Sequence, residues 1–309
     1  NVNLPLDTIE ALAWGSNLDW GFNKHPPLSA ILVEFIYLIF GSQDWSYYLL
    51  SQICVIIAFI FVWKFSEEIF DDKIYSLISL FLLEGIYFYN FTTPEFNVNV
   101  CQLPFWALTV YYFWKSLNNN KKKDWLLFGI FSALGFLSKY LFIYLLLAIF
   151  IYFLFNIKKN KKIIIPYFSS IIISLIILIP HFIWLVQNDF TTIMYGFGRT
   201  GIDENNFSNY IINPTIFILK QIGILIPIFF MIFILLKKIK TKINFKNKKT
   251  LFLIFINIVP FLLILVTAIF TGAKIRTMWM TPFYLFFGVL LINIFEKNIL
   301  LNNLKKFYA

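Results

Sequence analysis

Ionisable side chains are concentrated near the start of the chain, in the segment LDTIEALAWGSNLDWGFNKH (6–25). Asp7 and Glu10 are three residues apart, so they face the same side if this segment forms a helix. A carboxylate held in this way can take a proton from a hydroxyl group, as a general base does. Asp7 can also cap the helix with Glu10 at its third position, an acidic form of the capping box. The two roles are compatible.

A further carboxylate, Glu95, lies in the segment FTTPEFN (91–97) at the end of a hydrophobic stretch. We expect it either to orient hydroxyl groups beside the first two carboxylates or to be an ordinary turn residue. Glu84 lies within a hydrophobic stretch, where an acid is costly unless it is paired. It is a weaker candidate for the same site.

Five basic side chains could bind an anion. Arginine binds phosphate in a bidentate manner, and lysine acts as a point charge. Alternatively, lysine and arginine at the ends of hydrophobic helices extend towards lipid headgroups. The five candidates are Lys24, His25, Lys139, Lys274 and Arg276. His25 and His181 are the only histidines, and no metal-binding spacing is present, so we expect neither a metal site nor another cofactor.

Composition indicates the elements that must position these groups. The 309 residues are 60% hydrophobic and 14% charged, whereas soluble domains are about 45–50% apolar and about 25% charged. Because about 20 apolar residues cross a membrane as a helix, the sequence predicts an all-α bundle with nine spans. The predicted spans are 44–64, 73–91, 99–117, 125–138, 141–156, 163–185, 213–236, 251–271 and 278–295.

The distribution of basic residues predicts the orientation of the bundle. One set of connections and flanking positions holds 20 of the 26 lysine and arginine residues. The positive-inside rule places this set in the cytoplasm and the candidate site on the outer face. The same rule accounts for the net charge of +10 without nucleic acid as a partner. The sequence GFGRTG (196–201) matches GxGxxG but follows a hydrophobic span, so we interpret it as a flexible outer loop rather than a dinucleotide site.

Residues 27–41 are apolar but too short to be read as a further span. As a helix they reach only about 22 Å, and they follow two prolines, which favour a helix start. We expect this helix to lie at the membrane interface, so that residues 1–43 form the first outer loop. Because the sequence begins with Asn1 rather than Met, we also expect a preceding span to have been removed, within one transmembrane domain that covers 1–309.

Five segments together resemble the membrane glycosyltransferases of the GT-C fold, in the bacterial branch related to dolichyl-phosphate-mannose–protein mannosyltransferases and the lipid A aminoarabinose transferase. They are LDTIEALAWGSNLDWGFNKHPPL, TTPEFNVNVCQLPFWAL, ALGFLSKY, IPHFIWLVQNDF and KIRTMWMTPFYL. Each segment is weak evidence alone, but they are spaced through almost the whole chain in family order. The resemblance implies interfacial helices in the first outer loop and a further C-terminal portion in relatives.

The resemblance also implies roles for individual residues. Asp7 matches a catalytic aspartate of the first loop, although Thr8 stands where the family often has a second acid. His25 falls where relatives have a basic residue before Pro-Pro. Glu95 matches an acid of the second outer loop, and Lys139 matches a lysine near the donor phosphate. Lys274 and Arg276 suit that same role.

The resemblance therefore implies transfer of a sugar from a polyprenyl-phosphate donor to an acceptor hydroxyl on the outer face of the bacterial inner membrane. Inversion at the sugar and independence from metal are expected. The acceptor is a lipid such as lipid A in lipopolysaccharide, a cell-envelope glycan or a protein. A transporter or lipid-linked sugar flippase is the alternative, and an inactive family member is a third possibility because of the missing second acid.

Overall fold

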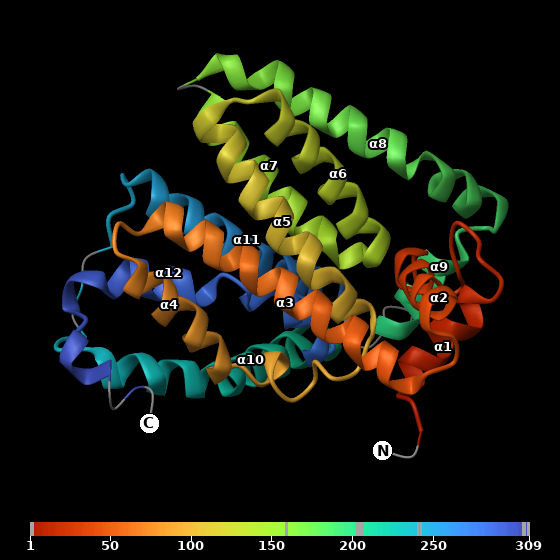
Figure 1. The fold of residues 1–309 in the computed structure, drawn as a ribbon, viewed down its shortest axis with the longest axis horizontal. Coiled ribbons are helices and arrows are strands. Elements are labelled where there is room, and N and C mark those ends of the chain that lie inside the picture. The colour runs from red at the N-terminus through yellow and green to blue at the C-terminus, as the bar shows by residue number, and fades with distance from the viewer. Residues whose placement is uncertain are drawn as a thin grey trace.

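The computed structural model describes residues 3–157, 160–201, 207–239, 241, 243–304 and 307. Within this part of the chain, every regular element is a helix (Figure 1). The α-helices are α1 Leu6–Gly15, α2 Leu28–Phe40, α3 Asp44–Ile69, α4 Lys73–Phe81, α5 Val98–Asn119, α6 Lys122–Ser138, α7 Ile143–Ile157, α8 Ile164–Gln187, α9 Thr191–Thr200, α10 Asn209–Leu235, α11 Lys248–Thr271 and α12 Phe287–Phe295. The predicted all-α membrane bundle is thus confirmed, and the lysines at 158, 159, 240, 242, 305 and 306 lie outside the described residues.

The predicted number of spans is too high. Among the described residues, five helices are long and apolar enough to cross a membrane, and a sixth span results if one bent pair of helices is counted. The five are Asp44–Ile69, Tyr140–Ile157, Lys161–Gln187, Asn209–Leu235 and Lys248–Thr271. The bent pair, Thr277–Tyr284 and Phe287–Asn298, turns through 52°.

The three remaining predicted spans fail for different physical reasons. The segment 73–91 does not form one helix, because α4 ends after 9 residues and the chain continues in the short 3-10 turns Leu82–Gly85 and Tyr87–Tyr89. Helix α6 has 17 residues, which is at the lower limit of the length that crosses a membrane. Helix α5 is long enough, but it carries buried polar side chains that lower its hydropathy, among them Asn99 and Gln102.

Helix α5 is the central element of the bundle. It packs between α3 and α6 and contacts the segment Thr277–Tyr284. Its Trp106 and Phe113 side chains are fully buried, and Phe113 packs its ring against Phe128 of α6, Tyr152 of α7 and Phe252 of α11. Such rings bury large apolar areas and favour edge-to-face or offset contacts. This aromatic core fixes the helices whose ends carry the candidate site.

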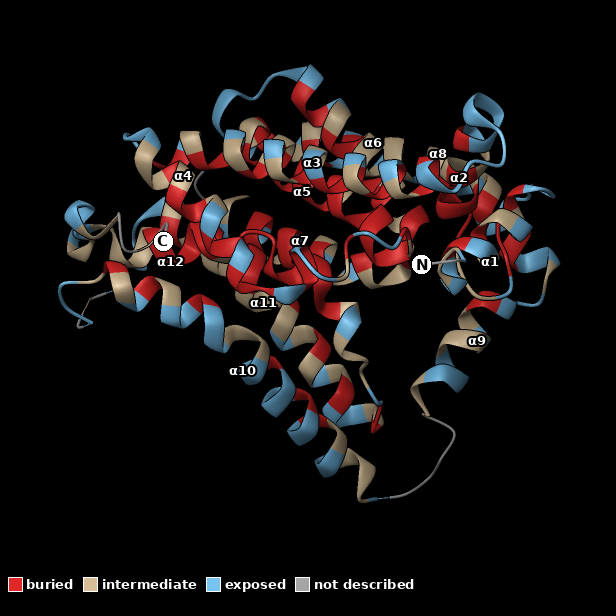
Figure 2. Cartoon of the chain, turned by 60° about the horizontal axis from the view of Figure 1, so that its bottom comes forward, coloured by how far each residue is buried: buried red, intermediate tan, exposed pale blue. Residues whose placement is uncertain are grey.

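Apolar side chains also cover much of the outer surface of the bundle. Ile165 and Ile176 of α8 and Phe230 of α10 are each more than half exposed. Figure 2 shows the exposed face of α10, in contrast to the buried residues of α5 and α7. In a helix that crosses a membrane, lipid tails cover such side chains, which agrees with a multi-pass membrane protein.

The basic connections gather at one end of the bundle. Lys249 donates a hydrogen bond to the carbonyl of Ile69 at 2.6 Å, and Lys248 donates to Asn118 at 2.5 Å, which joins the ends of α3, α5 and α11. Helices α1, α2 and α9 lie at the opposite end, on the right of Figure 1. The candidate site and the basic connections are therefore separated along the bundle, as the positive-inside rule requires.

Two short helices lie at the site end. Helix α2 forms within the predicted range and begins directly after Pro27; its 13 residues span about 20 Å. One of its faces is buried, whereas Phe35 and Leu38 are exposed. Its position at a membrane interface stays a prediction. The segment GFGRTG is not a flexible loop, because residues up to Thr200 belong to helix α9 and Gly201 closes that helix with a positive φ of 68°.

Close packing of α4 against α12 depends on Gly288, because a Cβ atom there would lie 2.1 Å from the carbonyl oxygen of Ser79. We expect Gly288→Ala to destabilise the protein by about 1–3 kcal/mol, as overpacking does. Gly223→Ala on α10 is the matched control, since no atom lies within 4 Å of its added Cβ. Thermal unfolding in detergent measures both variants, and equal melting temperatures would contradict the expected clash.

Candidate active site

Helix α1 presents its carboxylates to a pocket instead of using them as caps. The helix begins at Leu6, and its N-cap residue is Pro5, which has no side-chain capping hydrogen bond. The capping-box interpretation is therefore wrong, and Asp7 is an exposed residue in the first turn. Its negative charge near the N-terminus is favoured by the helix dipole. Asp7 is thus available for interactions outside its own helix.

Thr8 explains why a second acid directly after Asp7 does not suit this chain. It is 1% exposed, and its hydroxyl donates a hydrogen bond to the carbonyl of Phe96 at 2.9 Å. A carboxylate at position 8 would face that carbonyl oxygen without a proton to donate. Thr8 instead ties α1 to the segment that precedes α5. The second carboxylate of the pocket is Glu10, one turn further along α1.

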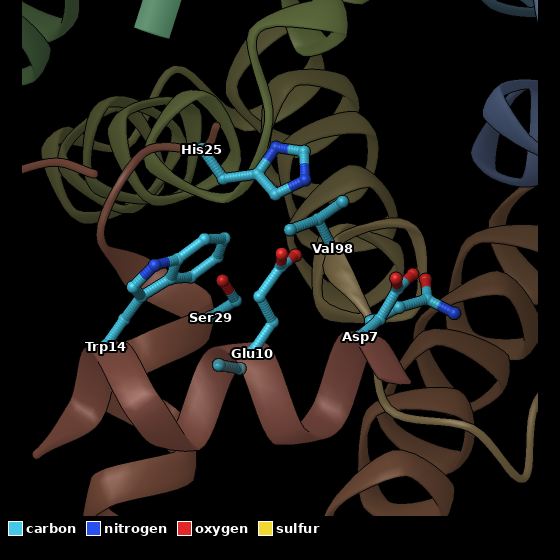
Figure 3. A pocket seen from close by; sticks show the side chains of 8 residues that line it. Asp7, Glu10, Trp14, His25, Ser29 and Val98 are labelled. Carbon is cyan, nitrogen blue, oxygen red and sulfur yellow. The ribbon is translucent and has the colours of Figure 1, made fainter. Parts of the chain in front are cut away.

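One pocket at the site end contains both carboxylates of α1 (Figure 3). Figure 3 shows the Glu10 carboxylate pointing towards His25, with Trp14 beside both. The rings of Trp14 and His25 meet edge to face, with centroids 5.9 Å apart. The pocket is lined by Asp7, Glu10, Ala11, Trp14, His25, Ser29, Asn97 and Val98. The three elements that build it are therefore α1, the 24–29 segment and the start of α5.

Lys24 forms an ion pair with Glu10, and this hydrogen bond raises the pKa of the Lys24 ammonium group. The same ammonium lies 5.9 Å from the centre of the Tyr195 ring of α9. Lys24 therefore neutralises the second carboxylate of the pocket and links α1 to α9. This geometry leaves Asp7 as the unpaired carboxylate of the pocket among the residues that the structure describes.

Lys139 is the buried cation of the site. It follows α6 directly, is 7% exposed, and donates a hydrogen bond from Nζ to the amide oxygen of Asn99 at 2.5 Å. Burial lowers the pKa of Lys139 to about 7; Asp7 opposes this shift and the charge of Arg276 adds to it. Asp7 and Arg276 are thus both within electrostatic range of Lys139, although the three residues come from distant parts of the chain.

His25 is not a cation at neutral pH. Burial, with smaller effects from the charges of Lys139 and Lys24, lowers its pKa to about 3. Any contact of His25 with a phosphate would then be made by the neutral ring, and this role stays a prediction. The neutral ring still offers one hydrogen-bond donor and one acceptor in the pocket.

Two further predicted site residues stand apart from this cluster. Glu95 and Lys274 are both exposed, in contrast to the buried Lys139 and the half-buried Arg276. The backbone of Lys274 donates a hydrogen bond to the carbonyl of Thr200 at 2.9 Å, which pairs this segment with the end of α9. Arg276, two residues after Lys274, is half-buried, and its charge lowers the pKa of Lys139. In the described part of the chain, no group of three or more His, Cys, Asp or Glu side chains could hold a metal ion.

The loop between α1 and α2 is held against α8 by residues that the sequence did not assign to the site. His181 is fully buried, with its Nδ1 2.5 Å from the carbonyl of Trp20, so Nδ1 carries the proton. Its Nε2 accepts a hydrogen bond from the hydroxyl of Tyr140 at 2.9 Å. The indole of Trp184 donates to Asp19 at 2.7 Å. No sequence pattern shows these partners, because the bonded pairs are far apart along the chain.

The fold and the site define this protein as a multi-pass helical membrane protein in which carboxylates and cations meet at one end of the bundle. A comparison with solved structures finds ArnT from Cupriavidus metallidurans bound to undecaprenyl phosphate, with a TM-score of 0.69 and 12% sequence identity. The match covers 98% of this chain and 58% of that chain. It shows that this chain has the GT-C fold of that structure. A comparison with curated proteins gives no match.

The sequence also matches the family model of dolichyl-phosphate-mannose-protein mannosyltransferase over residues 24–184, which is slightly more than half of the chain. The chain belongs to this family. Lys24, His25, Lys139, His181 and Trp184 fall inside the matched region, whereas Asp7, Asp19, Trp20 and Arg276 fall outside it.

Proposed function

We propose that this protein transfers a sugar from a polyprenyl-phosphate donor to an acceptor hydroxyl, with Asp7 as the base. The proximity of Asp7, Lys139 and Arg276 supports this proposal most directly. A carboxylate within electrostatic range of a buried cation supplies what removal of a proton and departure of a phosphate require. Membership of the mannosyltransferase family supports the same class of reaction.

The proposed step uses only side chains of this chain and needs no metal. Asp7 takes the proton of the acceptor hydroxyl, whose oxygen then bonds to the anomeric carbon of the sugar. The bond from that carbon to the phosphate oxygen breaks, and its electron pair leaves with the polyprenyl phosphate. Lys139 and Arg276 stabilise this negative charge electrostatically. A single displacement inverts the anomeric configuration. Glu10, neutralised by Lys24, orients the acceptor.

The donor is the better supported of the two substrates. The structure similar to this chain is bound to undecaprenyl phosphate, which is the product of the proposed reaction with an undecaprenyl donor. The exposed apolar surface of α8 offers the kind of contact that a lipid tail requires. For the acceptor we propose a hydroxyl of a lipid, a glycan or a protein of the cell envelope, the classes that the sequence resemblance implied.

We propose that the site faces the periplasm or outside of a bacterial inner membrane. The separation of the pocket from the basic end of the bundle supports this orientation. Residues 1–43 would then form an outer loop that belongs to the single transmembrane domain 1–309, and α2 would lie in the interface. Glu95 and Lys274, which do not line the pocket, would be secondary contacts for the acceptor and the donor phosphate.

A transporter or flippase was the alternative, partly because Glu84 was expected inside a membrane helix. In the structure Glu84 is exposed in the 3-10 turn after α4, so this support is lost. Purified protein in liposomes with a labelled polyprenyl-phosphate sugar separates the two functions. We expect free polyprenyl phosphate to accumulate as sugar is transferred. Movement of intact donor across the bilayer, without release of polyprenyl phosphate, would contradict the proposed reaction.

A further inference from the structure

We propose that Asn99 and Gln102 of α5 are positioning residues that direct the Lys139 ammonium group towards the donor phosphate. This inference rests on the proposed function, because it assigns these two residues a role in holding the phosphate ligand. Neither residue lines the pocket in Figure 3, and neither is expected to touch the reacting atoms.

The main chain of Lys139 lies at a break between two helices, where Gln102 holds it by a hydrogen bond. Helix α6 ends at Ser138, and Lys139 has an extended backbone with φ −165° and ψ 135° before the next turn begins at Tyr140. This break between two helices turns the lysine out of the helical path. Gln102 donates a hydrogen bond from Nε2 to the carbonyl of Lys139 at 3.2 Å, and the backbone N–H of Phe142 donates to the same carbonyl at 3.0 Å. Both lone pairs of this carbonyl are thus occupied.

The side chain of Lys139 is held from the same face of α5. Asn99 and Gln102 are one turn apart, so their side chains lie on one side of the helix. The Asn99 amide oxygen accepts the hydrogen bond from Nζ, and the Trp279 ring centre lies 5.1 Å from Nζ. α5 therefore fixes Lys139 at two points, its carbonyl and its ammonium group.

Because the Asn99 amide that accepts the hydrogen bond from Lys139 is neutral, the lysine charge remains available for an anion. An ammonium group has three N–H donors, and Asn99 uses one of them. No carboxylate in the described part of the chain lies within ion-pair distance of Lys139. A phosphate oxygen can therefore satisfy the remaining donors and the charge at the same time. A carboxylate at position 99 would instead neutralise the lysine before a donor arrives.

The electrostatic surroundings of Lys139 make this positioning measurable. The charged and titratable groups that face it are Asp7 of α1, His25 of the following loop and Arg276 before the segment Thr277–Tyr284. Lys139 has a pKa of about 7 in the empty site, so its charged fraction falls as the pH rises above 7. Phosphate binding should weaken over the same range, because only the charged form attracts the anion.

The test measures binding of undecaprenyl phosphate to the full chain in nanodiscs between pH 7 and pH 9.5. A phosphate monoester has already lost its second proton in this range, because its second pKa is about 6. We expect Asn99→Leu to weaken binding at least about tenfold at pH 7 and to move the loss of affinity to lower pH, because Lys139 loses its acceptor. Gln102→Leu adds no charge and should also weaken binding, because the Lys139 carbonyl loses its hydrogen bond from Gln102.

Asn99→Asp gives the opposite sign and is the decisive variant. Its carboxylate favours the charged form of Lys139, so the loss of affinity should move to higher pH, while affinity at pH 7 falls because the carboxylate competes with phosphate. The matched control is Asn257→Leu, which removes a buried asparagine of α11 that donates only to Leu253 of its own helix. We expect wild-type binding and an unchanged pH dependence from this control.

The outcomes separate the inference from the function on which it rests. If the wild-type protein binds undecaprenyl phosphate but both Asn99 variants keep its pH dependence, the positioning role is overturned and the proposed function stands. If the wild-type protein does not bind the lipid, both proposals are overturned. If Asn99→Leu fails to fold, Asn99→Asp alone decides, because only a residue coupled to Lys139 moves the pH dependence upwards.

Discussion

Replacement of Asp7 by asparagine is expected to lower sugar transfer by about 10²–10⁴-fold, the usual contribution of a general base. Asparagine has nearly the same size but cannot accept the acceptor's proton. The exposed carboxylate makes no capping bond in α1, so folding and membrane insertion should not change. Donor binding should persist, because the cations that hold the phosphate remain. Single-turnover transfer from a labelled donor, with binding measured in parallel, tests this expectation.

Two further carboxylate variants control the Asp7 experiment. Glu84→Gln removes a negative charge from an exposed turn outside the pocket and should leave transfer unchanged. Glu10→Gln should have a smaller effect than Asp7→Asn, because Glu10 is already ion-paired with Lys24. Near-normal turnover by Asp7→Asn would refute its role as base. A dominant effect of Glu10→Gln would transfer that role to the second carboxylate.

The second large effect is expected from the cations of the site. Lys139→Ala and Arg276→Ala should each lower kcat/KM for the donor by about 10–100-fold, because hydrogen bonds to charged groups contribute about 1.5–3 kcal/mol. Each 1.4 kcal/mol corresponds to about a factor of ten. The loss should appear largely as weaker binding of polyprenyl phosphate, since the same charge interacts with donor and product. Inhibition by added undecaprenyl phosphate measures this directly.

A lysine far from the pocket provides the comparison for these cation variants. Lys64→Ala on α3 removes a lysine that lies over the ring of Phe61, and it should not change donor use. Lys274→Ala should have a weaker effect than Lys139→Ala, because Lys274 is exposed whereas Lys139 is buried. Unchanged donor dependence in both Lys139→Ala and Arg276→Ala would indicate that these residues only anchor helix ends to lipid headgroups.

The helical class of this protein was predictable because it depends on composition and on long apolar runs. The predicted spans 44–64, 163–185 and 251–271 correspond to α3, α8 and α11, where hydrophobicity continues over about 20 residues or more. The prediction failed for 73–91, because an apolar run does not show where a helix breaks into 3-10 turns. It also failed for 99–117, where polar residues that face other helices lower the hydropathy of a central helix.

Only part of the candidate site followed from the sequence. Residue type and helical spacing singled out Asp7 and Glu10. Lys139 and Arg276 were singled out because the positive-inside rule makes basic residues unusual on the outer face. Spacing could not show that Glu10 is neutralised by Lys24. It also could not show that His25 is uncharged at neutral pH, because burial sets that property.

The sequence alone determined that this chain forms a helical membrane bundle and which residue types could catalyse or bind an anion. These properties depend on the amino acids themselves and on neighbours within about one helical turn. The tertiary structure decided which of these groups meet, since α1, the end of α6 and the segment before Thr277 are far apart in sequence. Charge, burial and hydrogen-bond partners at such a site arise from contacts between distant segments, and no local pattern encodes those contacts.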